Sequence, residues 1–492
     1  MAGPSQSEKL RYAVGDTSHS HDDSFKHVLR NILLVVVLGA LTWAFCTALK
    51  LGVMASTSYL FAPFEQESTI GDYMLLEQHD IHDIQTAAYK EQTVMSEEQM
   101  DGLLILGIVM LAGGLIRGLL IRNKAWQAAE GDGASQTIAY FLHSYRHDDP
   151  KFDPVTDRYK TPTIWHACKR IIMTFLTLGT GGSGGLEGPV IPVGESLGAF
   201  VAKRFGIQSA DDLRAMQMAG IAAAVCTLLN APFASAIFAA EVVFSSYIVY
   251  RTLLYSIFSV VVAFSLNTLF LGQGKLFVIA PHSVSYNLLE YIQVVLVAII
   301  CSGPVGIGLN YIFRFFKNNF NYIPIVGRAA LGALGAFAIA VFMWFWLGIE
   351  PTHILGMGED TIEHVLVGGG NPQLHVWWVL LLVILAKSIA TGMTLMTGGS
   401  AGLLVPAMVL GGCMGGALHM LMLQYLPMLS TGLELFVVSG IASALVAIIE
   451  VPISAVLLVV SMFGESYAAP AMLSVAVCHL FVKSMRLYIR EH

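Results

Sequence analysis

The chain repeats itself, and the repeat carries breaks in the apolar segments at matching positions. Residues 180–198 (TGGSGGLEGPVIPVGESLG) align without a gap with residues 397–415 (TGGSAGLLVPAMVLGGCMG) when the sequence is shifted by 217 residues. A shift of 220 residues aligns a second pair of blocks, residues 220–241 and 440–461. Because both blocks recur in the same order, the apolar region divides into two related halves, about residues 100–272 and about residues 288–487.

The composition places both halves in a membrane. Hydrophobic residues make up 55% of the chain and charged residues only 12%, against about 25% charged in soluble domains. Several apolar segments are too short, or too broken by Gly and Pro, to cross a hydrocarbon core of about 30 Å. Irregular backbone survives at that depth only inside protein or beside water. We therefore expect an all-α polytopic membrane protein with two related repeats and broken, re-entrant helices, and not a β-barrel, a nucleic-acid-binding protein or a disulfide scaffold.

The charged residues predict the orientation of the segments. Residues 1–28 are polar and are expected to form a cytoplasmic tail before a membrane domain over 29–487, whose first span is 30–61. The connector 62–101 holds ten acidic residues and one basic residue, Lys90, whereas basic residues gather in 122–170 and near the C-terminus. The positive-inside rule places the acidic connector outside and both termini in the cytoplasm, in a bacterial inner or plasma membrane. No C-terminal regulatory domain is expected.

Two Gly-rich loops at matching positions predict helix N-termini inside the membrane. The loops Gly181–Pro189 and Gly398–Pro406 each end in a Pro suited to a first helical turn. A helix N-terminus offers up to four unbonded N–H groups and about half a positive charge, which bind a small anion. Glu130–Ser135 (EGDGAS) is a third candidate, just before another apolar stretch. The loops therefore predict an anion pathway near the bilayer midplane.

Glu187 is the acidic residue of these loops, and the second repeat has Leu404 at the equivalent place. A carboxylate within a membrane is a functional hypothesis by default. Its charge would compete with an anion for the same N–H groups, and protonation would release it. We predict that Glu187 is a gate and a candidate proton carrier. The alternative is a capping acid that only stabilises a buried helix N-terminus.

Three motifs carry a resemblance to a known family. GLEGP (Gly185–Pro189), NAPFASAIFAAE (Asn230–Glu241) and GLLVP (Gly402–Pro406), in this order within duplicated halves, resemble the CLC family of chloride channels and proton-coupled anion exchangers. The resemblance covers about residues 30–487. It implies that the two repeats have inverted topology. It also implies a voltage-gated type of anion transporter, not an enzyme, that forms a homodimer with one pore per subunit and uses no metal or other cofactor. The anion-binding residues that it implies are Asp132, Gly133, Leu186, Glu187, Gly188, Leu403, Leu404, Val405 and Tyr467.

The anion motifs also depart from the family pattern. Asp132 stands in the first motif where the family has a hydroxyl, and it either faces the pathway or caps the following segment. Leu404 replaces an aromatic residue in the third motif. An ungapped alignment of the last block puts Ser466 where the family has an anion-coordinating Tyr, and we favour the next residue, Tyr467.

The transport mode depends on one further position. Exchangers of the family carry a second, inner glutamate directly after the residue that matches Glu241, and this chain has Val242 there. We therefore lean to channel-like passive permeation of an anion, with chloride as first candidate. The alternative is a proton-coupled chloride exchanger, whose candidate proton pathway is Glu187, Glu241 and Val242.

An enzyme is the remote alternative. The loop around Ser183 fits the Gly-x-Ser-Gly pattern of intramembrane serine proteases, and His419 or His479 would then be the base. Duplication argues against this reading, because a nucleophile has no reason to recur as Ser400 in a matching loop.

Overall fold

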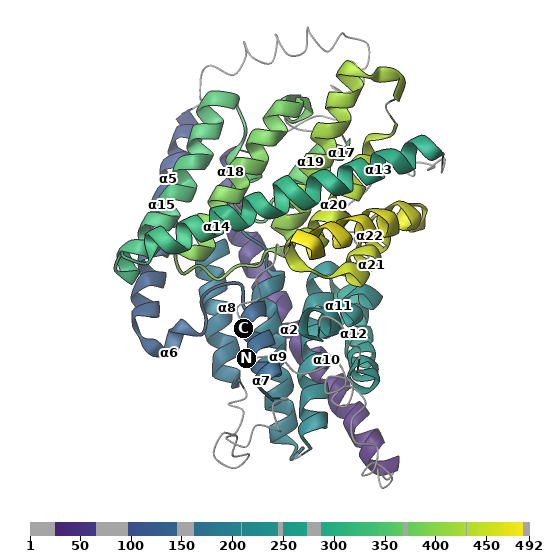
Figure 1. The fold of residues 1–492 in the computed structure, drawn as a ribbon. Helices are drawn as coiled ribbons and strands as arrows, with labels where there is room; N and C mark the ends of the chain where they lie inside the picture. Colours follow the sequence, from purple (N-terminus) through teal and green to yellow (C-terminus); the bar gives the residue numbers. More distant parts are fainter. Residues whose placement is uncertain are drawn as a thin grey trace. The chain divides into compact units, whose positions relative to one another are not determined.

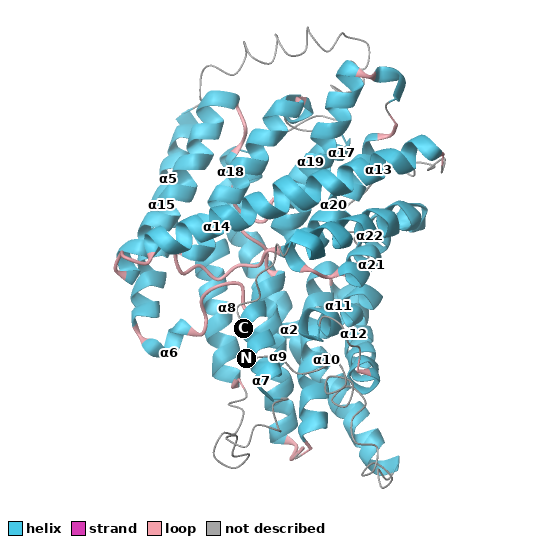
Figure 2. Ribbon diagram, in the orientation of Figure 1, coloured by secondary structure: helices cyan, strands magenta, loops and turns pink. Residues whose placement is uncertain are grey.

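The structure is a computed structural model that describes residues 25–64, 97–144, 162–207, 209–244, 249–272, 287–367, 372–429 and 431–485. Over these ranges the regular elements are helices (Figures 1 and 2), and β-structure is limited to one isolated bridge between Gly185 and Gly402. Nine helices in the described part are long and apolar enough to cross a membrane. The expected all-α membrane fold is confirmed. The acidic connector lies outside the described residues from 65 to 96, as does most of the N-terminal tail.

The described helices fall into two compact units. The first comprises residues 1–48, 133–171 and 190–274. It holds the first parts of α2 (Phe25–Phe61) and α8 (Ile164–Leu178) and most of α9 (Glu187–Arg204). It also holds α7 (Ala134–Ser144), α10 (Ala210–Leu229), α11 (Pro232–Phe244) and α12 (Tyr250–Phe270). Helix α10 packs against α11 and α12, and α11 also packs against α7.

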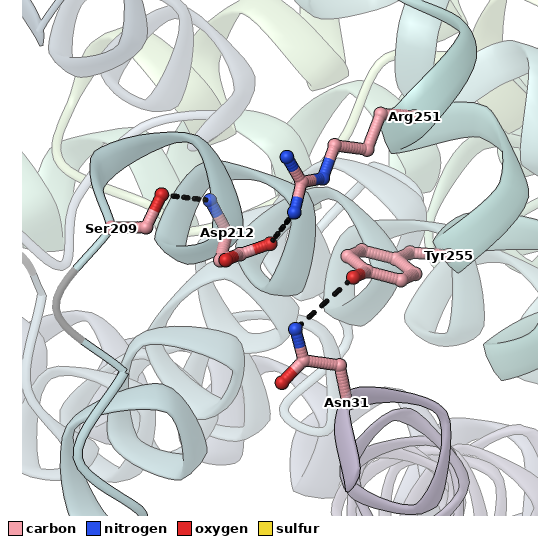
Figure 3. A network of polar contacts seen from close by, with 5 residues as sticks. All are labelled: Asn31, Ser209, Asp212, Arg251 and Tyr255. Carbon is pink, nitrogen blue, oxygen red and sulfur yellow. Dashed lines mark hydrogen bonds and ion pairs between the residues drawn. The ribbon is translucent and has the colours of Figure 1, made fainter. Parts of the chain in front are cut away.

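Polar contacts fix the helix ends in this first unit (Figure 3). Ser209 caps α10 by accepting a hydrogen bond from the Asp212 N–H at 3.4 Å. The Asp212 carboxylate binds the Arg251 guanidinium of α12 at 2.6 Å. On the next turn of α12, the Tyr255 hydroxyl accepts a hydrogen bond from the Asn31 amide of α2 at 3.2 Å. These contacts tie three helices together.

The second unit comprises residues 49–132, 172–189 and 275–492. Its helices are α5 (Glu97–Arg122), α6 (Lys124–Gln127), α13 (Leu288–Ile300), α14 (Gly306–Phe320), α15 (Ile325–Leu347), α16 (Pro351–Ile354), α17 (Glu359–Val367), α18 (Trp377–Met396), α19 (Leu404–Tyr425), α20 (Leu433–Ile449), α21 (Pro452–Phe463) and α22 (Ala468–Met485), with the second parts of α2 and α8. Helix α15 packs between α5 and α18, and α19 packs between α18 and α20 (Figure 1).

Two matching apolar segments, one in each repeat, are each broken into two helices. Residues 215–240 form α10 and α11, separated at Asn230, and residues 434–462 form α20 and α21, separated at Glu450. Both residues take the left-handed conformation, with φ of +52° and +62°, and no other non-glycine residue in the described ranges has positive φ. They are 220 residues apart, the offset of the second repeated block. The repeat therefore extends to the backbone conformation.

Candidate functional site

The two repeated loops pair with each other in the second unit. Helix α9 begins at Glu187 and α19 begins at Leu404, as the sequence predicts. Just before these helix starts, Gly185 and Gly402 exchange both backbone hydrogen bonds, at 2.8 and 2.6 Å. These backbone bonds hold the two helix N-termini together.

The first anion motif joins this pair. The Gly131 N–H donates to the Gly399 carbonyl at 2.9 Å. A Cβ atom at Gly188 would lie 2.5 Å from the Asp132 carbonyl oxygen and 2.7 Å from the Gly402 Cα. The three predicted motifs thus converge on Gly188, where no side chain fits. Asp132 itself is half-buried, and α7 begins two residues later, at Ala134.

Side-chain hydroxyls connect each loop to the helix that precedes the other loop. Two hydroxyl–hydroxyl contacts and two N–H-to-hydroxyl bonds are related by the 217-residue offset of the sequence. They are Thr174–Ser400 at 2.8 Å with Ser183–Thr391 at 3.0 Å, and Ser400 N–H to Thr177 Oγ1 at 3.0 Å with Ser183 N–H to Thr394 Oγ1 at 3.1 Å. Reciprocal contacts of this kind require a two-fold relation between the loops. Ser183 and Ser400 therefore each bind the helix that precedes the opposite loop, α18 and α8 respectively, and this structural role accounts for their duplication.

The Glu187 carboxylate faces the start of α19. It accepts hydrogen bonds from its own N–H and from the N–H of Val405, in the first turn of α19. The side chain is 3% exposed, and its Oε2 atom has no hydrogen-bond partner within the described part of the chain. Glu359 and Lys50 are the charged side chains that act on it most strongly. Glu187 thus occupies N–H groups that the sequence assigns to an anion.

A cavity of about 180 Å³ lies in the same unit, between α2 and the connector from α15 to α18. Its lining is Val53, Met54, Thr57, Ser58, Phe61, Leu178, Thr352, Leu355, Gly356, Met357, Gly358, Glu359 and Asp360. Burial raises the pKa of Glu359, and nearby Lys50 opposes this shift. The cavity wall therefore carries the acid that acts on Glu187.

The other predicted anion-site residues lie where the chain turns into α19, α9 and α22. Leu186, Leu404 and Val405 are buried and Leu403 is partly exposed, while Gly133 directly precedes α7. Tyr467 ends a short helix, Glu465–Tyr467; it is 3% exposed and its hydroxyl has no partner among the described residues. Ser466 is exposed. Burial therefore favours Tyr467 over Ser466, and its contact with an anion remains a prediction.

Glu241 and Val242 lie next to each other on α11, in the first unit. Both side chains are 5% exposed. Their part in a proton pathway remains a prediction.

Two buried cations lie near the loops and are not among the site residues that the sequence predicts. Arg117 of α5 is 2% exposed and donates to the Gly113 carbonyl at 3.3 Å and to the Thr177 hydroxyl at 3.2 Å. Lys387 of α18 is fully buried. Both stand out as single charges within apolar runs, which is the signal that identifies functional or structural charges in membrane segments.

Replacing Thr177 by Val should lower the stability of the protein by about 1–3 kcal/mol, because buried donors on Ser400 and Arg117 would lose their acceptor. The matched control is Thr227→Val, since the Thr227 hydroxyl is equally buried but bonds only to the Ala223 carbonyl of its own helix. Urea unfolding in detergent measures both. Equal losses in the two variants would contradict the bridging role of Thr177.

Comparison with known proteins identifies relatives over most of the chain. The model of the voltage gated chloride channel family matches residues 113–483. An uncharacterised protein of Methanocaldococcus jannaschii is 24% identical over 316 residues, which are 64% of this chain and 74% of the relative. The H(+)/Cl(-) exchange transporter ClcA of Vibrio cholerae is 23% identical over 344 residues, which are 66% of this chain and 69% of the relative.

Solved structures show the same fold. A slow cyanobacterial Cl-/H+ antiporter superposes with a TM-score of 0.70 at 16% identity, over 93% of this chain and 95% of the other. A CLC-type fluoride/proton antiporter superposes with a TM-score of 0.64 at 18% identity, over 93% and 96%. The family match spans both repeated loops and three quarters of the chain. The chain therefore belongs to the voltage gated chloride channel family.

Proposed function

We propose that this integral membrane protein exchanges a small anion, with chloride as first candidate, for protons, and that Glu187 is both gate and proton acceptor. The observation that carries the proposal is the Glu187 carboxylate on the N–H of Val405 at the start of α19. An ionised carboxylate and an anion compete for that N–H group. Protonation removes the charge and weakens the competition. One side chain thereby links proton binding to anion binding.

Exchange is favoured over the channel-like permeation suggested by Val242. The relative from Vibrio cholerae is named an H(+)/Cl(-) exchange transporter, and both solved neighbours are antiporters. These names favour the exchanger alternative, although no acid stands at Val242. The inner half of the proton pathway then depends on Glu241 or on water rather than on an acid at position 242.

The proposal includes the assembly and its placement. The family resemblance supports a homodimer in the bilayer, and the distribution of basic residues supports cytoplasmic termini. Each is open to test by cross-linking and by labelling of cysteines placed at the ends of the chain.

The decisive measurement is proton movement driven by a chloride gradient in liposomes. We expect outward chloride flow to drive protons inward against their gradient, at one chloride-to-proton ratio for all gradients applied. Glu187→Gln should abolish the proton movement, because its amide does not take up a proton. Chloride movement without coupled protons in the wild type would contradict exchange and restore the channel reading.

A further inference from the structure

Lys387 is a buried cation to which the proposed exchange assigns no role. Its side chain is fully buried on α18, in an apolar helix long enough to cross a membrane. The ammonium donates to the Leu355 carbonyl at 3.2 Å and to the Gly356 carbonyl at 3.0 Å. A charge at such a position is costly unless polar groups replace its water. The two carbonyls supply that replacement.

The backbone of the connector, residues 355–358, lies close around this ammonium. Gly356 and Gly358 both take positive φ, +58° and +87°, where glycine is favoured. A Cβ atom at Gly358 would lie 2.9 Å from the Lys387 Nζ atom. The segment 355–358 therefore wraps the ammonium closely, and any side chain at Gly358 would crowd it.

The same segment also holds the loop before Glu187. The Gly356 carbonyl, which binds Lys387, accepts a second hydrogen bond from the Gly184 N–H at 3.1 Å. One residue earlier, the Ser183 hydroxyl donates to the Ile354 carbonyl at 2.9 Å. Consecutive carbonyls thus connect Lys387 to the turn that ends at Glu187, three residues after Gly184.

We propose that Lys387 is a positioning residue for the gate. Its ammonium fixes the carbonyls of Leu355 and Gly356, and through them the Ser183–Gly184 turn that sets Glu187 against α19. The inference rests on the proposed role of Glu187. In the other repeat, the residue at the 217-residue offset is Arg170, which is also fully buried and donates to the Gln136 amide oxygen at 2.7 Å. Both repeats thus hold a buried cation at this helix position.

Lys387 is not among the charges that act most strongly on Glu187, so its influence on Glu187 passes through the connector and the loop. Its neighbours are Asp360 on α17, Cys413 on α19 and His353 on α16. Burial lowers the pKa of His353 to about 3, so this imidazole is neutral in the working range. Glu187 itself responds most strongly to Glu359 and Lys50. Lys387 therefore reaches Glu187 through hydrogen bonds.

The test is a series at position 387 in the full-length reconstituted protein. Chloride affinity is measured by isothermal titration, and chloride flux from liposomes is measured from pH 4.5 to 9.5. Lys387→Met removes charge and donors, and should weaken chloride affinity by about tenfold, the size expected from losing a charge-assisted hydrogen bond, and displace the pH profile. Lys387→Arg keeps the charge and the donors on a larger, planar group, so it should weaken chloride affinity less than Lys387→Met does. Lys387→Gln, which keeps donors alone, should fall between them.

Gly358→Ala provides a second route if Lys387→Met does not fold. The added methyl group should displace the ammonium and change affinity and pH profile in the same direction as Lys387→Met. The inference is overturned if folded Lys387→Met has the affinity and pH profile of the wild type, even if its thermal stability is lower. If only Gly358→Ala folds, the same result in that variant overturns it. Glu187→Gln is measured in parallel. If Glu187→Gln keeps the pH dependence of flux, the proposed gate is wrong. If Glu187→Gln loses this pH dependence while Lys387→Met behaves as the wild type, only the positioning role of Lys387 is wrong.

Discussion

Chloride flux through Glu187→Gln should be almost independent of pH, whereas wild-type flux should rise steeply as the pH falls. The ionised carboxylate sits on the Val405 N–H, and an anion about 4 Å from it would be repelled by roughly 4 kcal/mol at an effective dielectric of 20. This corresponds to several hundredfold in anion binding. Glutamine keeps the shape without the charge. Flux from liposomes between pH 4.5 and 9.5 measures the difference.

Glu359→Gln is the matched control for this experiment. Glu359 lines the cavity and acts on Glu187 through space, whereas Glu187 itself contacts α19. Removing this like charge should move the flux profile to lower pH and leave its steepness unchanged. A flux profile in Glu187→Gln as steep as that of the wild type would remove Glu187 from the gate and leave it as a helix cap.

The starts of α9 and α19 could be predicted because their causes are local. Glycine-rich turns followed by Pro189 and Pro406 mark helix N-termini within a few residues. The helix breaks at Asn230 and Glu450 are harder to predict from the sequence. Both residues are flanked by apolar runs, and a left-handed Glu at a helix C-terminus has no strong sequence signal. The signals that mark both breaks are a proline two residues later, Pro232 and Pro452, and the repetition at one offset.

The contacts that assemble the site could not be predicted, because they join residues far apart in the chain. Gly131 meets Gly399, and the partners of Lys387 lie in a connector more than thirty residues before it. Hydropathy shows Lys387 as a charge within an apolar segment, but not which carbonyls receive it. Glu359 likewise reads as an ordinary acid at a helix start until the fold brings it near Glu187.

Gly188→Ala should abolish anion transport, although it adds a single methyl group. The new Cβ atom would lie 2.5 Å from the Asp132 carbonyl oxygen and 2.7 Å from the Gly402 Cα, and both are backbone atoms that cannot rotate away. Relief of this overlap requires the three motif loops to separate, and the N–H groups at the start of α9 and α19 then no longer converge. We expect flux and chloride affinity each to fall by at least about a hundredfold, since a displacement of about 1 Å at such a site can cost that much.

Gly308→Ala is the matched control for Gly188→Ala. A Cβ atom at Gly308, on α14, would have no heavy atom within 4 Å. Alanine there should keep full transport and raise stability by about 0.5–1 kcal/mol, because alanine loses less conformational entropy than glycine in a helix. Liposome flux and isothermal titration on both variants, after size-exclusion chromatography shows equal folding, separate packing at the loops from a general effect of the substitution. Wild-type flux in Gly188→Ala would mean that the loops tolerate separation, and the anion would then need ligands other than their backbone N–H groups.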